Sequence, residues 1–309
     1  MTAVMVEQRG ALGLVTLNRP EALNAIDLEM VRAIQAALHR LADDPTVKSV
    51  ALVSASPKAF CAGGDVRAAV KASIEKGAEF FRAEYILNHD IATYPKLLVA
   101  VVDGLAMGGG LGLSVHARHC LVTENAQMAM PEMAIGLFPD VGAGAFLNRH
   151  SLELGLYLAL TGARLDAADA LYAGLANGYL LSVHIPDLLH ALERGQDFSS
   201  LLEQPAEESR LKMQDLTLDP ERLTGSPTSI KITIKHLTDS RGQDLKTVLK
   251  NEYRLACACL RGHDFHEGVR AMLIDKDRQP QWQPATLAGV TDPMVRAHWG
   301  TPVGSDLQV

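Results

Sequence analysis

The sequence predicts an α/β protein with a largely parallel sheet and a C-terminal helical region. Short apolar runs alternate with helix-like patterns up to Leu152, and beyond that residue the pattern is almost entirely helical. Strands that alternate with helices imply βαβ crossovers, and such crossovers join parallel strands. Apolar residues make up 48% of the 309-residue chain, which is enough to fill a sizeable core.

The first elements are a series of strands with helices between them. Short apolar runs bounded by turn residues predict strands at residues 12–17, 50–53, 97–102 and 121–123. Helices are expected after Asp27 and over residues 71–89 and 111–117. Asp27 is a suitable N-cap, because the apolar residues that follow it recur at helical spacing: Met30, Ile34, Leu38 and Leu41.

Helix signals dominate the rest of the chain. N-cap signals occur at Asp166, with Gly174 as the stop, at Ser226 before Pro227, and at Asp264, which forms a capping-box-like pair with Glu267. Residues 245–260 predict a further helix packed in the core. Residues 193–223 are charged and weakly periodic, which indicates a variable connector. We therefore expect a core over residues 1–185 and a helical region over 186–309.

Composition excludes several classes of protein. A net charge of −7 without a basic stripe disfavours a nucleic-acid partner. The most apolar run, residues 97–102, is far shorter than the ~20 residues of a membrane span. No secretory signal is visible, so we expect the cytosol or an organelle matrix. The cysteines have spacings that favour neither disulfides nor a zinc site: Cys61, Cys120, Cys257 and Cys259.

Two glycine-rich turns are the first candidates for chemistry. Residues 59–65 and residues 107–112 each follow a predicted strand, and the second turn also opens a helix. Such turns let a ligand approach backbone N–H groups, and two convergent N–H groups form an oxyanion hole. Neither turn is a dinucleotide fingerprint, since Leu113 stands where the third glycine should be, and neither contains the Lys of a P-loop.

Two carboxylates form the second candidate feature. Glu132 and Asp140 lie eight residues apart, each directly after a proline, on turns that follow a strand. Rigidly held carboxylates suit acid–base or nucleophilic work. Apolar neighbours such as Leu137 and Phe138 indicate a pocket that would raise the pKa of a carboxyl group.

These motifs together resemble the crotonase (enoyl-CoA hydratase/isomerase) superfamily. The matching segments are residues 58–65, the glycine turn 108–110 and Pro131-Glu132. Further segments are nearer to the thioester hydrolases of the superfamily than to its hydratases: residues 107–116, 130–142, 158–162, 226–229 and 261–270. The resemblance runs from Leu12 to Ala285 and implies a crotonase-like spiral of ββα units.

The resemblance also implies roles for individual residues. The N–H groups of Gly64 and Gly109 would form the oxyanion hole, Glu132 would be the principal catalytic carboxylate, and Asp140 its partner. Further substrate contacts are implied at Glu84, Ala22, Leu23, Asn24, Ala62, Gly63 and Asp65. The substrate would be an acyl-CoA, with coenzyme A as part of the substrate and no other cofactor or metal. Trimers or hexamers occur in the superfamily, so a homo-oligomer is an expectation.

One departure from the family pattern favours hydrolysis. Hydratases carry a second catalytic glutamate at the position that Gly112 occupies here, and water addition to an enoyl-CoA needs two acid–base groups. An acyl-CoA thioester hydrolase is therefore the expected function. The alternatives are a hydratase-like lyase or isomerase, in which Glu132 moves a proton on the acyl chain, and a non-catalytic acyl-CoA-binding protein. The connector between Tyr179 and Ser226 is also shorter than is typical of these hydrolases.

Two weaker signals suggest other chemistry. His263 and His266 lie three residues apart beside Glu267, which is compatible with a metal face but more typical of a polar helix start. Ser114 and His116 suggest a serine hydrolase, but the segment lacks the second glycine of the nucleophile elbow.

Overall fold

The computed structural model describes residues 2–219 and 223–309. The chain forms two compact units that interleave along the sequence. The first contains Met1–Gly64, Leu87–Ala129 and Arg164–Gln214, and the second contains Asp65–Ile86, Met130–Ala163 and Asp215–Val309. The division expected after residue 185 is based on secondary-structure content and not on compactness, and it stays a prediction.

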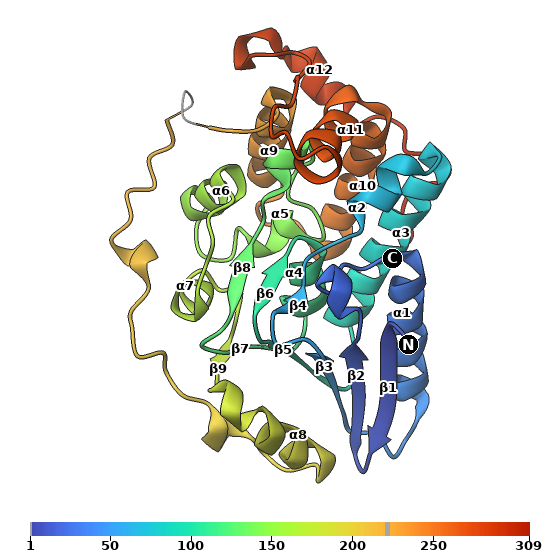
Figure 1. The fold of residues 1–309 in the computed structure, drawn as a ribbon, viewed down its shortest axis with the longest axis vertical. Helices are drawn as coiled ribbons and strands as arrows, with labels where there is room; N and C mark the ends of the chain where they lie inside the picture. The colour runs from blue at the N-terminus through green and yellow to red at the C-terminus, as the bar shows by residue number, and fades with distance from the viewer. Residues whose placement is uncertain (1, 220–222) are drawn as a thin grey trace. The chain divides into compact units, whose positions relative to one another are not determined.

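A six-stranded sheet forms the centre of the first unit, in the order β1-β2-β3-β5-β7-β9. Its strands are β1 (Val4–Arg9), β2 (Leu12–Leu17), β3 (Ser49–Ser54), β5 (Leu97–Val102), β7 (His119–Val122) and β9 (Gly178–Tyr179). β1 and β2 form an antiparallel hairpin, and the remaining neighbours pair in parallel (Figure 1). The strands β2, β3 and β5 are nearly continuous apolar runs, as is typical of parallel strands that are covered on both faces.

A second, three-stranded parallel sheet belongs to the same unit. It contains β4 (Ala59–Cys61), β6 (Leu105–Met107) and β8 (Gln127–Ala129), in that order. Each of these short strands directly follows a strand of the large sheet, so the chain repeats a β–β step before it enters a helix. The expected ββα repeat is therefore confirmed. The short strands escaped prediction because three residues are too few to show a period.

Most helices of the first unit begin near the residues that the sequence predicts. They are α1 (Leu28–Asp43), α4 (Gly109–Ser114), α7 (Ala167–Tyr172) and α8 (Ile185–Glu193), with short 3-10 turns η1 (Pro20–Ala22), η3 (Ser182–His184), η4 (Ser199–Leu201) and η5 (Arg210–Lys212). Asp27 caps α1 by accepting a hydrogen bond from Met30 N at 2.9 Å, and Asp166 caps α7 in the same way. Both N-cap predictions are confirmed. α1 lies beside β1 and β2 (Figure 1).

The second unit is almost entirely helical. Its helices are α2 (Val66–Lys71), the larger part of α3 (Ile74–Ala92), α5 (Ala143–Phe146), α6 (Leu152–Thr161), α9 (Pro227–Asp239), α10 (Leu245–Arg261), α11 (His263–Val269) and α12 (Asp292–Ala297), with η2 (Glu132–Ile135), a π-helical turn η7 (Arg270–Ile274) and η8 (Leu287–Gly289). Met133, Leu160 and Ile230 form an apolar cluster between η2, α6 and α9. Ser226 caps α9 as predicted, and its hydroxyl accepts from Ser229 N at 3.1 Å.

One local prediction is wrong, and one helix begins later than expected. The helix expected over residues 71–89 is α3, which begins at Ile74, while Lys71 is the last residue of α2. The capping box of Asp264 and Glu267 does not form, since α11 already begins at His263 with Gly262 as its N-cap. More distant backbone groups use both carboxylates instead: Asp264 accepts from Gln283 N, and Glu267 accepts from Gln281 N.

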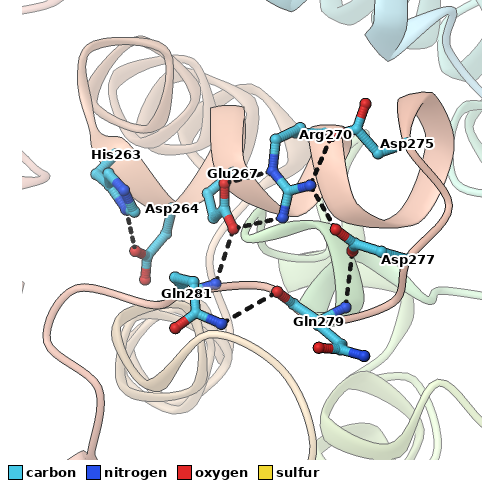
Figure 2. A network of polar contacts seen from close by, with 8 residues as sticks. All are labelled: His263, Asp264, Glu267, Arg270, Asp275, Asp277, Gln279 and Gln281. Atoms are coloured by element: carbon cyan, nitrogen blue, oxygen red, sulfur yellow. Dashed lines mark hydrogen bonds and ion pairs between the residues drawn. The ribbon is translucent and has the colours of Figure 1, made fainter.

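Figure 2 shows a network of polar contacts that involves residues of α11 and of the segment that follows it. Arg270 contacts Glu267, Asp275 and Asp277, and Glu267 also accepts from Gln281 N at 2.8 Å. This network holds the segment after η7 against α11. Among the described residues, no helix has both the length and the apolar character that crossing a membrane requires.

Candidate active site

The two glycine turns meet at one edge of the small sheet. β4 ends at Cys61 and β6 ends at Met107, and these two strands pair in parallel, so both turns leave the same edge. A β-carbon built on Gly63 would lie 3.0 Å from Met107 O and 3.6 Å from Gly109 N. The first turn therefore contacts the second through backbone atoms, and the contact leaves no room for a larger residue at position 63.

The backbone of these turns leaves two N–H groups unused. Among the described residues, the N–H groups of Gly64 and Gly109 have no hydrogen-bond acceptor. Gly63 and Gly108 have positive φ angles of 102° and 48°, a region that favours glycine. A β-carbon at Gly110 would lie 2.2 Å from Cys61 O, so α4 packs directly on the end of β4. That these two N–H groups bind one oxyanion stays a prediction.

Residues 22–24 hold the first glycine turn, residues 59–65, through hydrogen bonds. Leu23 O accepts the N–H of Ala62 at 3.0 Å. Asn24 is completely buried, and its amide nitrogen donates to Phe60 O at 3.0 Å and to Ser54 Oγ at 2.8 Å. The Asn24 side chain therefore holds β4 in place. Contact of Ala22 and Leu23 with the CoA nucleotide stays a prediction.

The three predicted acids all lie in the second unit and are all buried. Glu84 comes from α3, Glu132 is the first residue of η2, and Asp140 lies in the loop before α5. Their exposed fractions are 2%, 6% and 4%. Within the described part of the chain, Glu84 Oε1 and Glu132 Oε2 have no hydrogen-bond partner. Buried polar atoms without partners are costly, and they are common where a ligand or water completes the site.

Burial raises the pKa of all three carboxyls, and a neighbouring negative charge adds to the effect at each of them. Burial is the main cause of the raised pKa of Glu84, followed by the charges of Asp140 and Glu132. Burial also raises the pKa of Glu132 well above its usual value, and the charge of Asp140 adds to this. The pKa of Asp140 is raised to about 7, chiefly by burial. Groups that interact this strongly titrate as a set, and such sets are typical of catalytic sites.

Sequence reasoning missed two members of this cluster, Tyr85 and Glu252. The hydroxyl of Tyr85 donates to Asp140 Oδ2 at 2.6 Å and works against burial by lowering the pKa of Asp140. Glu252 lies on α10 with no exposed surface, and its charge raises the pKa of Asp140. A signal for Glu252 existed in the sequence: it occupies the buried face of α10 between Val248, Leu249 and Leu255, where an apolar residue is expected.

The remaining sequence signals have structural roles. Ser114 Oγ is buried and donates to Gly110 O at 3.0 Å, which is a helix-internal bond and not a nucleophile's arrangement. His263 contacts Asp264 (Figure 2). His266 contacts Leu260 O, so both histidines make contacts at the start of α11. Asp65 caps α2 by accepting from Ala68 N at 3.2 Å, and its contact with the substrate stays a prediction. The described residues contain no cluster of three His, Cys, Asp or Glu side chains arranged to hold a metal ion.

Comparison with known proteins identifies the family of this chain. The pattern of the family described as enoyl-CoA hydratase/isomerase matches residues 12–224 and 221–299. The chain therefore belongs to this family, and it is an acyl-CoA enzyme of the crotonase superfamily.

Sequence relatives point to one branch of that superfamily. The protein described as mitochondrial 3-hydroxyisobutyryl-CoA hydrolase of Rattus norvegicus is 41% identical over 348 residues, which covers 99% of this chain and 90% of the relative. The protein of the same description from Danio rerio is 42% identical over 335 residues, covering 94% of this chain and 88% of the relative.

Solved structures share the whole fold but have other descriptions. A Rhodobacter sphaeroides structure described as an enoyl-CoA hydratase superposes with a TM-score of 0.91 at 36% identity over the full length of both chains. A Mycobacterium thermoresistibile structure described as a carnitinyl-CoA dehydratase gives a TM-score of 0.92 at 34% identity, covering 100% of this chain and 99% of that one.

Proposed function

We propose that this protein hydrolyses an acyl-CoA thioester, and that its substrate is 3-hydroxyisobutyryl-CoA, which yields 3-hydroxyisobutyrate and CoA, a step of valine breakdown. The cluster of three buried carboxyls carries the proposal, because Glu132 has an unpartnered oxygen and a raised pKa beside Asp140. Relatives that are 40–42% identical and described as 3-hydroxyisobutyryl-CoA hydrolases support the choice of substrate. Their descriptions name mitochondria, so an organelle matrix or the cytosol is the proposed location.

The chemistry we propose uses two backbone N–H groups and three carboxyls. The N–H groups of Gly64 and Gly109 stabilise the oxyanion that forms when the thioester carbonyl is attacked, and one such donor typically contributes ~3 kcal/mol. Glu132 either attacks the carbonyl to give a mixed anhydride or removes a proton from the attacking water. Asp140 orients the substrate hydroxyl or the water, and Glu84 assists it. In either route the thiolate of CoA leaves as the oxyanion collapses. In the anhydride route a water molecule then cleaves the anhydride, which releases the product acid and regenerates the Glu132 carboxylate.

The second candidate is a lyase or isomerase that acts on the acyl chain. The descriptions of the two solved structures as a hydratase and a dehydratase favour it. Gly112 disfavours it, because the residue provides no side chain where hydratases place their second glutamate. Thiol release across a panel of hydroxyacyl, plain acyl and enoyl thioesters, together with loss of the enoyl absorbance band, distinguishes the two reactions. Hydration of the enoyl thioester without thiol release would overturn the hydrolase proposal.

Glu132→Gln tests the central residue. The change keeps the side-chain volume and removes the charge, so turnover should fall at least ~100-fold, the low end for a positioned acid–base group. Glu29→Gln, on the exposed start of α1, is the matched control and should keep full activity. Single-turnover hydrolysis in heavy-oxygen water places label in Glu132 for the anhydride route and only in the product for water attack. Full activity of Glu132→Gln would remove this residue from the mechanism.

A further inference from the structure

Glu252 makes an unusual set of contacts for a buried carboxylate. One oxygen, Oε2, accepts from Gly142 N at 2.6 Å. The other, Oε1, accepts from Gly144 N at 3.1 Å and contacts His236 Nε2 at 2.9 Å. Glu252 is 110 residues away from Gly142 in the sequence and has no exposed surface. Both of its oxygens are therefore used on the turn that directly follows Asp140.

The conformation of this turn requires a hydrogen-bond acceptor beside the N–H groups of Gly142 and Gly144. Val141 and Gly142 have φ angles of 54° and 90°, and two consecutive residues in the left-handed region are strained when one of them is β-branched. The turn leaves the N–H groups of Gly142 and Gly144 pointing inward, where water cannot solvate them. A carboxylate satisfies both, whereas an amide offers only one accepting oxygen.

The same turn is pressed against α9. A β-carbon at Gly144 would lie 2.5 Å from Ser240 Oγ and 2.8 Å from the ring of His236. His236 is itself buried, its other ring nitrogen contacts Ser240 Oγ, and its ring packs edge-to-face with that of Phe138. Glu252 and His236 therefore hold the turn from two helices, α10 and α9.

We infer that Glu252 is a positioning residue for Asp140: it fixes the turn that carries the acid and places a second negative charge near it. The inference rests on the proposed function only in taking Asp140 as part of the active site. Glu252 does not contact the reacting atoms. It acts through the backbone of residues 140–144 and through its charge.

The electrostatic consequence has a definite sign. Asp140 faces Tyr85 and Glu84 on α3, Glu132 on η2, and Glu252 and Cys259 on α10. The charge of Glu252 raises the pKa of Asp140. Removing that charge therefore lowers the pKa of Asp140, and whichever limb of the pH–rate profile reports this acid moves to lower pH.

Two substitutions separate the two roles. Glu252→Gln keeps the shape and removes the charge, so the Asp140 limb should move to lower pH while kcat falls ~10–100-fold, because a misplaced catalytic group typically has an effect of that size. Glu252→Asp keeps the charge and shortens the reach to the turn, so kcat should fall while the limb stays. If Glu252→Gln does not fold, wild-type kcat in Glu252→Asp still overturns the positioning role.

Asp169→Asn is the matched control. Asp169 is 2% exposed and, like Glu252, accepts from a distant backbone N–H, that of Arg210 at 3.0 Å, but it lies in the first unit. The Asp169→Asn substitution should lower the melting temperature without moving the Asp140 limb of the pH–rate profile.

A substrate-free titration separates this inference from the proposed function. The carboxyl of isotope-labelled Asp140 is followed by NMR in the wild type and in Glu252→Gln. An unchanged midpoint overturns the inference even if the protein is a hydrolase. A lowered midpoint in a protein that releases no thiol supports the link between Glu252 and Asp140 and refutes only the hydrolase proposal.

Discussion

Replacing Asp140 by Asn should make the protein more stable and less active. Asp140 is 4% exposed, and its pKa is raised from 3.8 to about 7, first by burial and also by the charge of Glu252. The folded state therefore disfavours the ionised form of Asp140. Asn has nearly the same volume, and its amide oxygen can still accept the hydrogen bond from Tyr85 OH.

The magnitude follows from the difference between the two pKa values. Below pH 3.8 the carboxyl is protonated in both the folded and the unfolded state, so it has no effect on stability. Between pH 3.8 and about 7 only the folded state keeps the proton, so the free energy of unfolding falls by ~1.4 kcal/mol per pH unit. Above pH 7 the full destabilisation of ~4 kcal/mol is present. Replacing one carboxyl oxygen by an amide nitrogen removes a hydrogen-bond acceptor, which offsets part of this effect. We therefore expect Asp140→Asn to raise the free energy of unfolding by ~2–4 kcal/mol at pH 8.

Chemical denaturation at pH 8 and pH 5 measures this effect. The gain should be smaller at pH 5 by ~2–3 kcal/mol, since wild-type Asp140 is then largely protonated in the folded state. Asp169→Asn is the control, because it breaks the 2.8 Å pair with Arg210 and should destabilise the protein at both pH values. A variant Asp140→Asn that is less stable than the wild type at pH 8, or equally stabilised at both pH values, would refute the reasoning.

Two further outcomes follow from the same geometry. Tyr85→Phe removes the 2.6 Å hydrogen bond that lowers the pKa of Asp140, so the Asp140 limb of the pH–rate profile should move to higher pH, opposite to Glu252→Gln. An unmoved limb, or one that moves down, would contradict the assigned bond. Gly110→Ala places a β-carbon 2.2 Å from Cys61 O, so thiol release should fall at least ~10-fold, since sub-ångström shifts of catalytic groups have effects of this order. Gly242→Ala, with φ +72° and no neighbour within 4 Å, should lose ~1–2 kcal/mol of stability through its left-handed backbone and keep its activity.

The active-site acids illustrate how far sequence reasoning reaches. Glu132 and Asp140 were predicted from their spacing and their preceding prolines, and the structure buries both within one unit. Glu84 came only from the family resemblance, because an acid in the middle of a helical pattern has no local mark. Tyr85 was missed for the same reason, although it is the direct hydrogen-bond donor to Asp140.

The capping-box error has a physical cause. The pattern of Asp264 and Glu267 is a local signal, and Asp264 instead accepts from a backbone N–H that lies many residues away, that of Gln283. The buried side chain of Asn24 likewise holds β4 through Phe60 O, and its expected contact with the ligand stays a prediction.

What the sequence determined by itself are the features that depend on neighbours in the chain. The alternation of strands and helices, the N-caps at Asp27 and Ser226, and the glycine turns all follow from local backbone and periodicity rules. Only the tertiary structure decided which carboxyls are buried together and which groups hold them. The pairing of Glu252 with Gly142 spans 110 residues, and no local pattern records which distant helix will bring an acceptor to a buried N–H group. Burial sets the pKa of Asp140, and burial is a property of the folded chain as a whole.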